Sequence, residues 1–443
     1  MRSNVFRILC LIAFFVAMPA HALLPIQHWQ TKSGARVYFV EARDLPMLDI
    51  SVDFPAGSAF GTREKSGLPM LTQHLLRLGA GGLSDDEIAG RLADVGAQLG
   101  GRFDADRAGV SVRTLTSAAE LEQALDLLAR IVQRPEFPAA VLEREKARII
   151  GSIREADTKP ETLLARQFGQ LAYGAHPYSL RRSGEADTVA ALSRNDLVAF
   201  YRAHYGANRA VVALIGNLSR AEAGAIAERL TGELPQLAVR QALPEVPALT
   251  QPVIKTIEHP ASQSHLMVGA PGIRRGDPDY FALFLGNHIL GGGGFTSRIT
   301  EQVREKRGLA YSAYSYFTPL LERGPFVIGL QTRRDQVGQA LAVVRETLSD
   351  FVAKGPTADE LKKAKQNLVG GFPLRIDSNR KILDYLATIG FYELPLTYLE
   401  DFVPNIEKVS IADVRAAFAR RVNPDAMVTV AVGADEAALR AAR

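Results

Sequence analysis

Residues 48–57 read LDISVDFPAG, and this short stretch sets the pattern for the rest of the chain. Apolar side chains alternate with Asp and Ser as far as Phe54, a period of two that predicts a half-buried β-strand. Pro55 and Gly57 end the strand, a polar loop follows, and residues 67–78 form an apolar segment of helical length. The stretch therefore predicts a strand, a turn and a helix in that order.

The same order of elements recurs later in the chain. Residues 265–290 repeat the strand, the Pro-Gly turn, the polar loop and the apolar helix. Gly57 and Gly272 lie 215 residues apart, while Gly216 and Gly433, each at the end of a later predicted strand, lie 217 residues apart. Two markers at opposite ends of one unit share nearly the same offset, so the chain is interpreted as a duplication.

A duplicated unit of this size predicts an α+β fold with two homologous halves arranged as a clamshell. Each half is expected to be a mainly antiparallel sheet with helices packed on one face, because the chain lacks the short βαβ rhythm of a parallel sheet. The predicted division of the 443 residues is a signal peptide at 1–22, an N-terminal half at 23–234, a Pro-rich linker at 235–252 and a C-terminal half at 253–443.

Local capping signals mark helices inside the first half. Ser84 with Glu87, and Ser117 with Glu120, have the spacing of capping boxes and predict helix starts. A longer helix is expected over residues 139–155.

The first 22 residues have the pattern of a signal peptide. Arg2 and Arg7 precede an apolar run at 8–18 that is too short to span a bilayer, and cleavage is expected after Ala22. The only cysteine, Cys10, lies in this segment, so the mature chain is expected to have no disulfide and no thiolate ligand. We expect a periplasmic or secreted protein with no membrane span after cleavage; the alternative is a short uncleaved anchor.

Charge and motif content exclude several classes of function. With 52 basic and 48 acidic residues and no basic stripe, the chain is not expected to bind nucleic acid. It has neither the Gly-x-Ser-x-Gly motif of α/β-hydrolases nor the phosphate-binding loop of nucleotide enzymes. No two histidines lie three to five residues apart, so no helix carries a zinc pair by itself.

Motifs along both halves resemble a known family. The segments FPAGS at 54–58 and GLPMLTQH at 67–74 resemble the entrance to the active site of the pitrilysin/insulinase metallopeptidases, the inverzincins, in which Gly-Leu precedes His-x-x-Glu-His. Further matches are AHPY at 175–178, the segment 290–311 and GFPL at 371–374. The resemblance covers nearly all of the mature chain and implies a two-half peptidase fold.

The resemblance places the zinc motif where this chain has lost it. The motif aligns with Met70, Gln73 and His74, which keep only the second histidine. A thioether competes poorly for Zn²⁺, and an amide cannot deprotonate water. The family's third ligand, a downstream carboxylate, aligns with residues 149–152, which contain none, and Glu155 is not assigned to that role. We expect no metal and no cofactor in this chain; His74 is either a leftover histidine with a local hydrogen bond or a weak, non-zinc ligand.

The second half keeps the features by which relatives bind substrate. Arg304 and Tyr311 have the spacing of an arginine/tyrosine pair that, in the family, the C-terminal half directs at the substrate. A phenol can donate a hydrogen bond to a developing oxyanion, and a guanidinium can bind carbonyl oxygens. The alternative is that Arg304 belongs to a solvated charge run and Tyr311 packs on a strand.

A run of four glycines precedes this pair. It is interpreted either as a hinge or substrate-facing loop, because residues without Cβ allow close backbone approach, or as a plain helix-terminating loop. The run consists of Gly291, Gly292, Gly293 and Gly294.

A lost metal motif beside a retained substrate pair is similar to the inactive subunit of two-chain bacterial peptidases. The resemblance predicts a non-zinc subunit of a heterodimeric zinc metallopeptidase, whose partners are a zinc-bearing homologous subunit and a peptide substrate. Alternatives are an inactive peptide-binding or assembly protein, similar to the core subunits of respiratory complexes, and an active enzyme with a rebuilt metal site.

Overall fold

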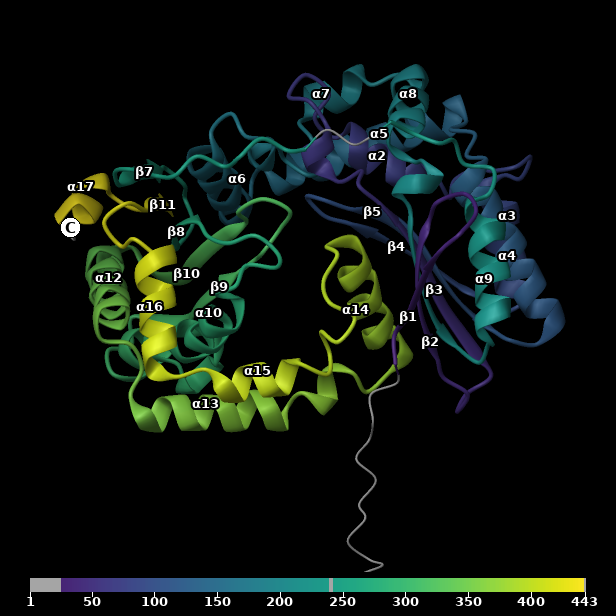
Figure 1. Ribbon diagram of the computed structural model, residues 1–443. Coiled ribbons are helices and arrows are strands. Elements are labelled where there is room, and N and C mark those ends of the chain that lie inside the picture. The colour runs from purple at the N-terminus through teal and green to yellow at the C-terminus, as the bar shows by residue number, and fades with distance from the viewer. Residues whose placement is uncertain (1–24, 239–241, 442–443) are drawn as a thin grey trace, which may run out of the picture.

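The structure is a computed structural model that describes residues 25–238 and 242–441. The predicted signal peptide at 1–22 and its cleavage site lie outside the described residues. The described chain forms two β-sheets that stand at opposite sides of the molecule, each with its own group of helices (Figure 1).

The first sheet has six strands in the order β1-β2-β6-β3-β5-β4, and the second has five in the order β7-β11-β8-β10-β9, counted over the described residues. The first sheet consists of β1 Gln27–Gln30, β2 Arg36–Glu41, β3 Met47–Phe54, β4 Gln98–Phe103, β5 Ala108–Leu115 and β6 Val211–Gly216. The second consists of β7 Val253–Ile257, β8 Gln263–Pro271, β9 Ala310–Phe317, β10 Pro325–Arg333 and β11 Val428–Val432.

The two sheets have one topology, which confirms the duplicated α+β fold predicted from the glycine spacing. In each sheet one parallel pair, β2 with β6 or β7 with β11, is followed by three antiparallel pairs. Strands β3 and β8, which the sequence placed at equivalent positions, occupy the same place in their sheets. Strand β1 is an addition at the outer edge of the first sheet.

Helices follow the strands in both halves. The helices before residue 240 are α2 Leu68–Leu75, α3 Asp85–Asp94, α4 Ala118–Gln133, α5 Ala139–Ala156, α6 Pro160–Tyr173, α7 Ala186–Ala191, α8 Arg194–His204 and α9 Arg220–Thr231. The later helices are α10 Tyr280–Asn287, α11 Arg298–Thr300, α12 Val337–Lys354, α13 Ala358–Gly370, α14 Asn379–Phe391, α15 Phe402–Lys408, α16 Ile411–Arg421 and α17 Glu436–Ala441.

The two helix starts predicted from capping boxes differ from each other in their hydrogen bonds. Ser84 begins α3 with the full reciprocal capping box to Glu87. Ser117 begins α4, but its hydroxyl donates to the Glu120 carboxylate at 2.5 Å instead of accepting from the helix backbone. The helix expected over 139–155 is α5.

Each half sends one helix to the sheet of the other half, which the sequence did not predict. Helix α14 packs on β2, β3 and β6 of the first sheet, and α6 packs on β8 and β11 of the second. Helices therefore cover both faces of each sheet, whereas the prediction placed them on one face. The physical reason is visible in β6 and β11, where every residue is buried, because a strand that is apolar on both faces needs cover on both.

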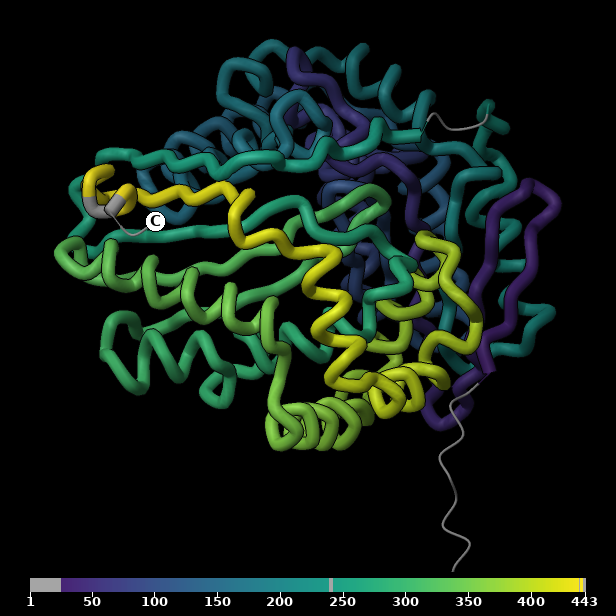
Figure 2. The backbone as a smooth tube through the Cα atoms, turned by 60° about the vertical axis from the view of Figure 1, so that its left-hand side comes forward, coloured from purple at the N-terminus to yellow at the C-terminus, as the bar shows by residue number. Residues whose placement is uncertain are grey.

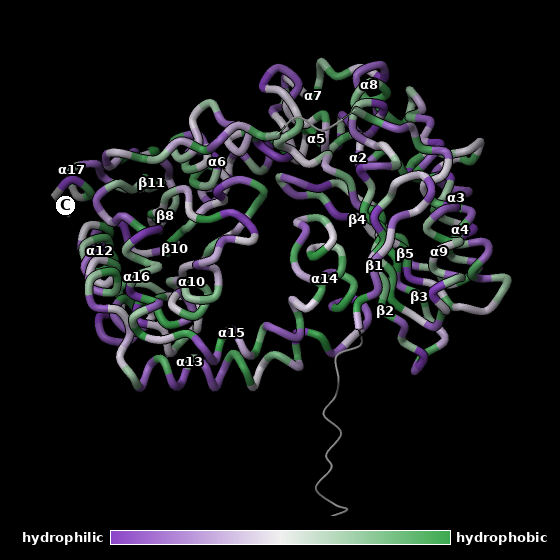
Figure 3. The backbone as a smooth tube through the Cα atoms, in the orientation of Figure 1, coloured by the Kyte–Doolittle hydropathy of each residue, from purple (hydrophilic) through white to green (hydrophobic). Residues whose placement is uncertain are grey.

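This exchange joins the two halves through one apolar core. Tyr38, Val40 and Val211 of the first sheet belong to the same cluster of buried side chains as the helices of the second half. The second sheet likewise buries Val428 and Val430 against α6. Figure 3 shows hydrophobic residues concentrated along the strands, whereas the outer helix α13 is largely hydrophilic.

The Pro-rich segment between the halves is part of this packing. After residue 241 the chain crosses from the first half to the second beside α6 (Figure 2), and Val246 is fully buried against that helix. The Pro244 carbonyl lies 2.9 Å from Nε2 of His176.

Among the described residues no helix is both long and apolar enough to cross a membrane.

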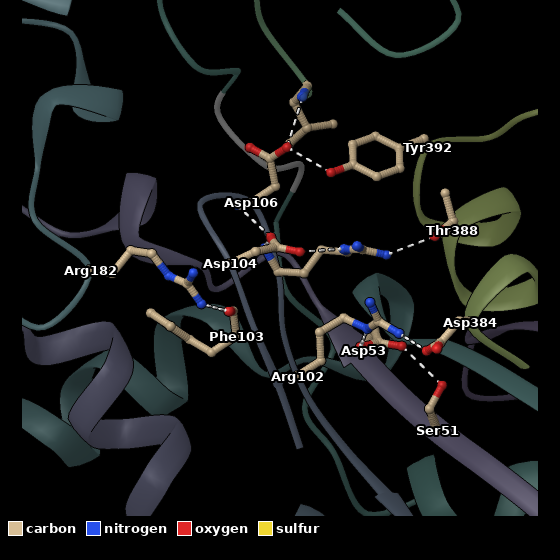
Figure 4. A network of polar contacts seen from close by, with 12 residues as sticks. Ser51, Asp53, Arg102, Phe103, Asp104, Asp106, Arg182, Asp384, Thr388 and Tyr392 are labelled. Carbon is tan, nitrogen blue, oxygen red and sulfur yellow. Dashed lines mark hydrogen bonds and ion pairs between the residues drawn. The ribbon is translucent and has the colours of Figure 1, made fainter. Parts of the chain in front are cut away.

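A buried carboxylate fixes the contact between the halves. Asp106, in the turn between β4 and β5, accepts a hydrogen bond from the hydroxyl of Tyr392 at 2.9 Å (Figure 4). It also accepts from the hydroxyl of Tyr178 at 2.7 Å and from the backbone N–H of Leu321 at 2.8 Å. These donors come from three segments far apart in the chain. The network therefore holds the turn of the first sheet against α14 and the loop before β10.

Candidate functional site

The degenerate motif lies on α2, whose start requires a glycine. Gly67, the residue before the helix, has a φ of 95°, and Pro69 stands in the first turn. Met70 is partly buried against the core of the first half. The side-chain amide of Gln73 donates to the Gly109 carbonyl at 3.0 Å, so it is used to attach α2 to β5.

The remaining histidine of the motif contacts a carboxylate on α5. Nε2 of His74 lies 2.9 Å from Oε2 of Glu145, and the two side chains are 18% and 8% exposed. Glu145 is also bonded by Arg148, whose Nε donates to Oε2 at 2.8 Å, and by Arg144, whose Nε donates to Oε1 at 3.2 Å. The carboxylate is therefore surrounded by an imidazole and two guanidiniums.

The contacts of His74 assign its tautomer. A neutral imidazole has one N–H, and the Glu145 carboxylate places it on Nε2. Nδ1 is then free to accept from the Arg77 guanidinium, which lies 3.4 Å away. Burial and the charges of Arg77 and Arg148 lower the pKa of His74, although Glu145 acts in the opposite direction.

The surroundings of Glu145 favour its ionised form. Burial by itself would raise its pKa, but hydrogen bonds from His74, Arg148 and Arg144 outweigh burial and lower the pKa to about 2. A buried carboxylate of this kind needs compensating positive charge, and here arginine side chains provide it.

This arrangement does not fit a zinc ion. Nη2 of Arg148 lies 3.0 Å from Nε2 of His74, so a fixed positive charge stands beside the one imidazole that could bind metal. Met70 packs in the core and Gln73 is bonded to the backbone, so neither offers a zinc ligand. Within the described part of the chain no group of three His, Cys, Asp or Glu residues could hold a metal ion.

Sequence reasoning missed Glu145. The resemblance places the family's downstream carboxylate at residues 149–152, which contain none. Glu155, one helical turn later, pairs with Lys159 at 2.8 Å in the structure. A signal was nevertheless present, because Glu145 falls on the stripe of α5 that is otherwise formed by Leu142, Ile149 and Ile153. A charge on the buried stripe of an amphipathic helix requires a partner.

The arginine/tyrosine pair predicted in the second half comes together in the structure. Arg304 lies in the π-helical turn Glu301–Glu305, and Tyr311 is the second residue of β9. The guanidinium carbon of Arg304 lies 4.8 Å from the centre of the Tyr311 ring and 4.6 Å from the centre of the Phe295 ring. The guanidinium therefore lies at cation–π distance from two aromatic rings, and its Nε is also 3.3 Å from the Glu305 carboxylate.

Both side chains line a cavity of about 430 Å³ on the surface of the second half. The Tyr311 side chain is 82% exposed there and Phe295 is 67% exposed. The cavity continues along β9 past Tyr314 and Tyr316, whose rings stack 5.8 Å apart. Because β9 is the edge strand of its sheet, its outer backbone groups have no strand partner.

The glycine run forms the opposite wall of this cavity. Gly291 and Gly292 end a π-helical turn, His288–Gly292, and Gly294 begins a short 3₁₀ turn with a φ of 64°. A Cβ at Gly291 would lie 2.4 Å from the hydroxyl of Ser315 in β9, so only glycine fits there. Gly291, Gly292 and Gly294 line the cavity, whereas Gly293 is not among its lining residues.

The predicted site residues thus fall into two groups. Arg304, Tyr311 and three of the four glycines share one cavity in the second half. Met70, Gln73 and His74 lie on α2 in the first half and contribute nothing to that cavity.

Comparison with known proteins shows the family of the chain. The family described as Insulinase (Peptidase family M16) matches residues 39–184, and the family described as Peptidase M16 inactive domain matches residues 191–368. A solved structure of a peptidase M16 inactive domain from Pseudomonas fluorescens is 39% identical, with a TM-score of 0.89. It matches over 93% of this chain and 98% of that chain.

Curated relatives include proteins named as zinc proteases and one named as a non-peptidase homolog. The uncharacterized zinc protease YmxG of Bacillus subtilis is 25% identical over 353 residues, which is 80% of this chain and 85% of that protein. The non-peptidase homolog YmxG of Helicobacter pylori is 26% identical over 422 residues, which is 92% of this chain and 94% of that protein. The chain therefore belongs to the M16, or insulinase, family of peptidases and is a homologue of that family's inactive domains.

Proposed function

We propose that this chain is the non-zinc subunit of a two-subunit zinc metallopeptidase and that Arg304 and Tyr311 bind the peptide at the zinc site of its partner. The expected location is the periplasm, following export by the predicted signal peptide at 1–22. The partner is a homologous subunit of similar length with an intact His-x-x-Glu-His motif.

The observation that carries the proposal is the contact of the Arg304 guanidinium with the rings of both Phe295 and Tyr311. Three large side chains are held in one arrangement at the surface, and the Tyr311 side chain is 82% exposed with no packing role for its hydroxyl. Exposed aromatic groups with a fixed geometry are typical of binding surfaces. The neighbouring edge strand β9 runs along the cavity, but its Ala313 and Ser315 carbonyls already accept from Thr300 and Asn287, so the proposal rests on the side chains of the cavity.

The chemistry of the two groups fits peptide hydrolysis. When bound by the partner, zinc supplies an activated water and polarises the scissile carbonyl. The Tyr311 hydroxyl then donates a hydrogen bond to the negative charge that develops on the carbonyl oxygen. The Arg304 guanidinium, held in place by its two rings, binds a neighbouring carbonyl or carboxylate of the substrate with parallel N–H donors.

The test is reconstitution from purified subunits. The isolated chain is expected to hydrolyse no peptide, and mixing it with the zinc-bearing subunit should produce activity that neither chain has alone. Arg304→Gln should remove most of that activity. Arg307→Gln is the matched control, because Arg307 is an exposed arginine of the same segment that bonds only Gln302 and lies outside the cavity.

The outcomes separate this proposal from the alternative of an inactive peptide-binding or assembly protein. Peptide hydrolysis by the isolated chain, or full activity of the partner in its absence, would contradict the proposal. Peptide binding at Arg304 and Tyr311 without any gain of hydrolysis in the mixture would instead support the assembly or binding role.

A further inference from the structure

A second cavity, of about 240 Å³, lies within the second half between α10, α14 and α15. It shares no lining residue with the Arg304–Tyr311 cavity. Most of its wall is aromatic and comes from Tyr280, Phe284, Tyr385, Tyr398 and Phe402. The rings pack edge to face or stacked, as between Phe284 and Phe402 with centres 5.9 Å apart, so the wall is rigid and apolar.

Two guanidiniums face this aromatic cavity. Nε of Arg275 is buried without a hydrogen-bond partner, and its guanidinium lies 5.4 Å from the centre of the Tyr392 ring. Arg375 is an exposed residue whose guanidinium lies 5.5 Å from the centre of the Phe284 ring and bonds the Tyr385 hydroxyl. Over residues 25–238 and 242–441 neither arginine has an ion-pair partner, in contrast to Arg298 and Arg421 of the same half.

The one acid in the lining is already neutralised from outside. Asp384 on α14 forms an ion pair with Arg102 of β4, and Thr388 on the next turn accepts from Arg107 at 3.4 Å (Figure 4). The charge of Asp384 is therefore used in the contact between the halves. The lining carries two guanidiniums and one carboxylate, so the balance of charge in the cavity is positive.

We propose that this cavity binds a carboxylate carried by an aromatic group, with the carboxylate on Arg275 and Arg375 and the ring among the tyrosine and phenylalanine side chains. The hydroxyls of Tyr385 and Tyr398 lie in the same lining, where the first is bonded to Arg375 and the second to Tyr280. The same chemistry has two sources, the C-terminal residue of a peptide and a free aromatic acid. The site does not depend on the zinc-bearing partner, so it can be tested on this chain alone.

Titration calorimetry with small probes tests the site on the unmodified chain. N-acetyl-phenylalanine should bind, and N-acetyl-phenylalaninamide, which lacks only the charge, should bind at least about tenfold more weakly, since a charge-assisted hydrogen bond is worth at least that factor. Acetyl-Ala-Ala-Phe distinguishes the sources: affinity equal to or above that of the single residue assigns peptide C-termini, and loss of binding assigns free acids.

Variants locate the binding. Arg275→Gln and Arg375→Gln should each weaken N-acetyl-phenylalanine by about tenfold or more. Arg380→Gln is the matched control, because Arg380 is an exposed arginine of α14 that does not line the cavity. The affinity of this variant for N-acetyl-phenylalanine should stay within about twofold of that of the unmodified chain. Thermal unfolding of each variant shows whether it is folded. The comparison of N-acetyl-phenylalanine with its amide uses the unmodified chain and so does not depend on the folding of any variant.

Three results would overturn the inference. They are equal binding of acid and amide, unchanged binding in both arginine variants, and no binding of any aromatic acid at millimolar concentration. Competition by inorganic phosphate at equal strength would also overturn it, because a bare anion site makes no use of the aromatic wall.

Discussion

At the scale of single residues, the first half uses the side chains of the degenerate motif for packing and hydrogen bonding. Arg148 stands beside His74 and Glu145, where its positive charge compensates the one carboxylate that remains. A buried carboxylate without positive neighbours would destabilise the fold by several kcal/mol. The arginine contacts within α5 compensate Glu145, and its hydrogen bond with His74 joins α5 to α2. In the second half Tyr311 is exposed, and the partly buried Arg304 lies against its ring.

The acid dependence of stability tests the first of these points. The pKa of Glu145 is lowered from 4.5 to about 2 in the folded chain, so its contribution is complete above pH 4.5 and is lost as the pH falls toward 2. Glu145→Gln should therefore reduce the free energy of unfolding by roughly 2–3 kcal/mol at pH 7 and by less than half of that at about pH 3. Urea unfolding at the two pH values measures the difference.

Glu143→Gln is the control for that experiment. Glu143 is 68% exposed on the same helix and pairs only with Lys146 at 3.0 Å, so its substitution should change stability little at either pH. A cost of Glu145→Gln that is the same at both pH values would show that the carboxylate is not held ionised by its arginine and histidine neighbours.

At the scale of elements, helices and strands marked by nearby residues were predicted correctly, whereas the sheet that each helix covers was not. Strand β3 and helix α2 follow from side-chain period, and the start of α3 follows from Ser84 with Glu87; each signal lies within or next to the element that it predicts. Nothing in Pro160–Tyr173 shows which sheet α6 covers, because an amphipathic stripe specifies burial but not the surface that buries it. Glu145 was missed for the same reason, since its partner His74 lies on another helix.

The turn at the glycine run makes an element-scale prediction. Gly291→Ala places a methyl group 2.4 Å from the Ser315 hydroxyl and 2.7 Å from its backbone N, so the π-helical turn must move away from β9. We expect a loss of about 1–3 kcal/mol in stability, as for overpacking, together with weaker peptide binding at the Arg304–Tyr311 cavity.

Gly151→Ala provides the matched control. Gly151 lies inside α5 with open space around its Cβ position, so alanine there should stabilise the chain by about 0.5–1 kcal/mol and leave peptide binding unchanged. Denaturant unfolding and peptide titration of both variants give the two readouts. If Gly291→Ala is as stable and binds as well as the unmodified chain, the close packing of the turn on β9 is not required.

At the scale of the whole molecule, the exchange of α6 and α14 makes the two halves one folding unit. The face of β2 and β6 that α14 covers would be exposed in an isolated first half, as would the face of β11 in an isolated second half. We expect the halves expressed separately, divided at residue 241, to be poorly folded and to bind a hydrophobic dye. Coexpression of the two fragments should restore a stable complex with the thermal unfolding of the intact chain. A first half that unfolds cooperatively by itself would contradict this expectation.

A joined pair of halves also suits a subunit that presents one fixed surface to a partner. The cavity with Arg304 and Tyr311 lies on a half that is held against the other by the Asp106 network, so its orientation is set before any partner binds. Preorganised donors lower a reaction barrier more than mobile ones, because they need no reorientation as charge develops.

The turnover of the reconstituted two-subunit enzyme with Tyr311→Phe tests the central claim most directly. Removing one donor to a developing oxyanion lowers kcat by about 10²-fold, so this loss is expected with little change in the zinc content of the partner or in the stability of the complex. A kcat equal to that of the unmodified complex would contradict the assignment, because the Tyr311 hydroxyl would then have no part in the reaction.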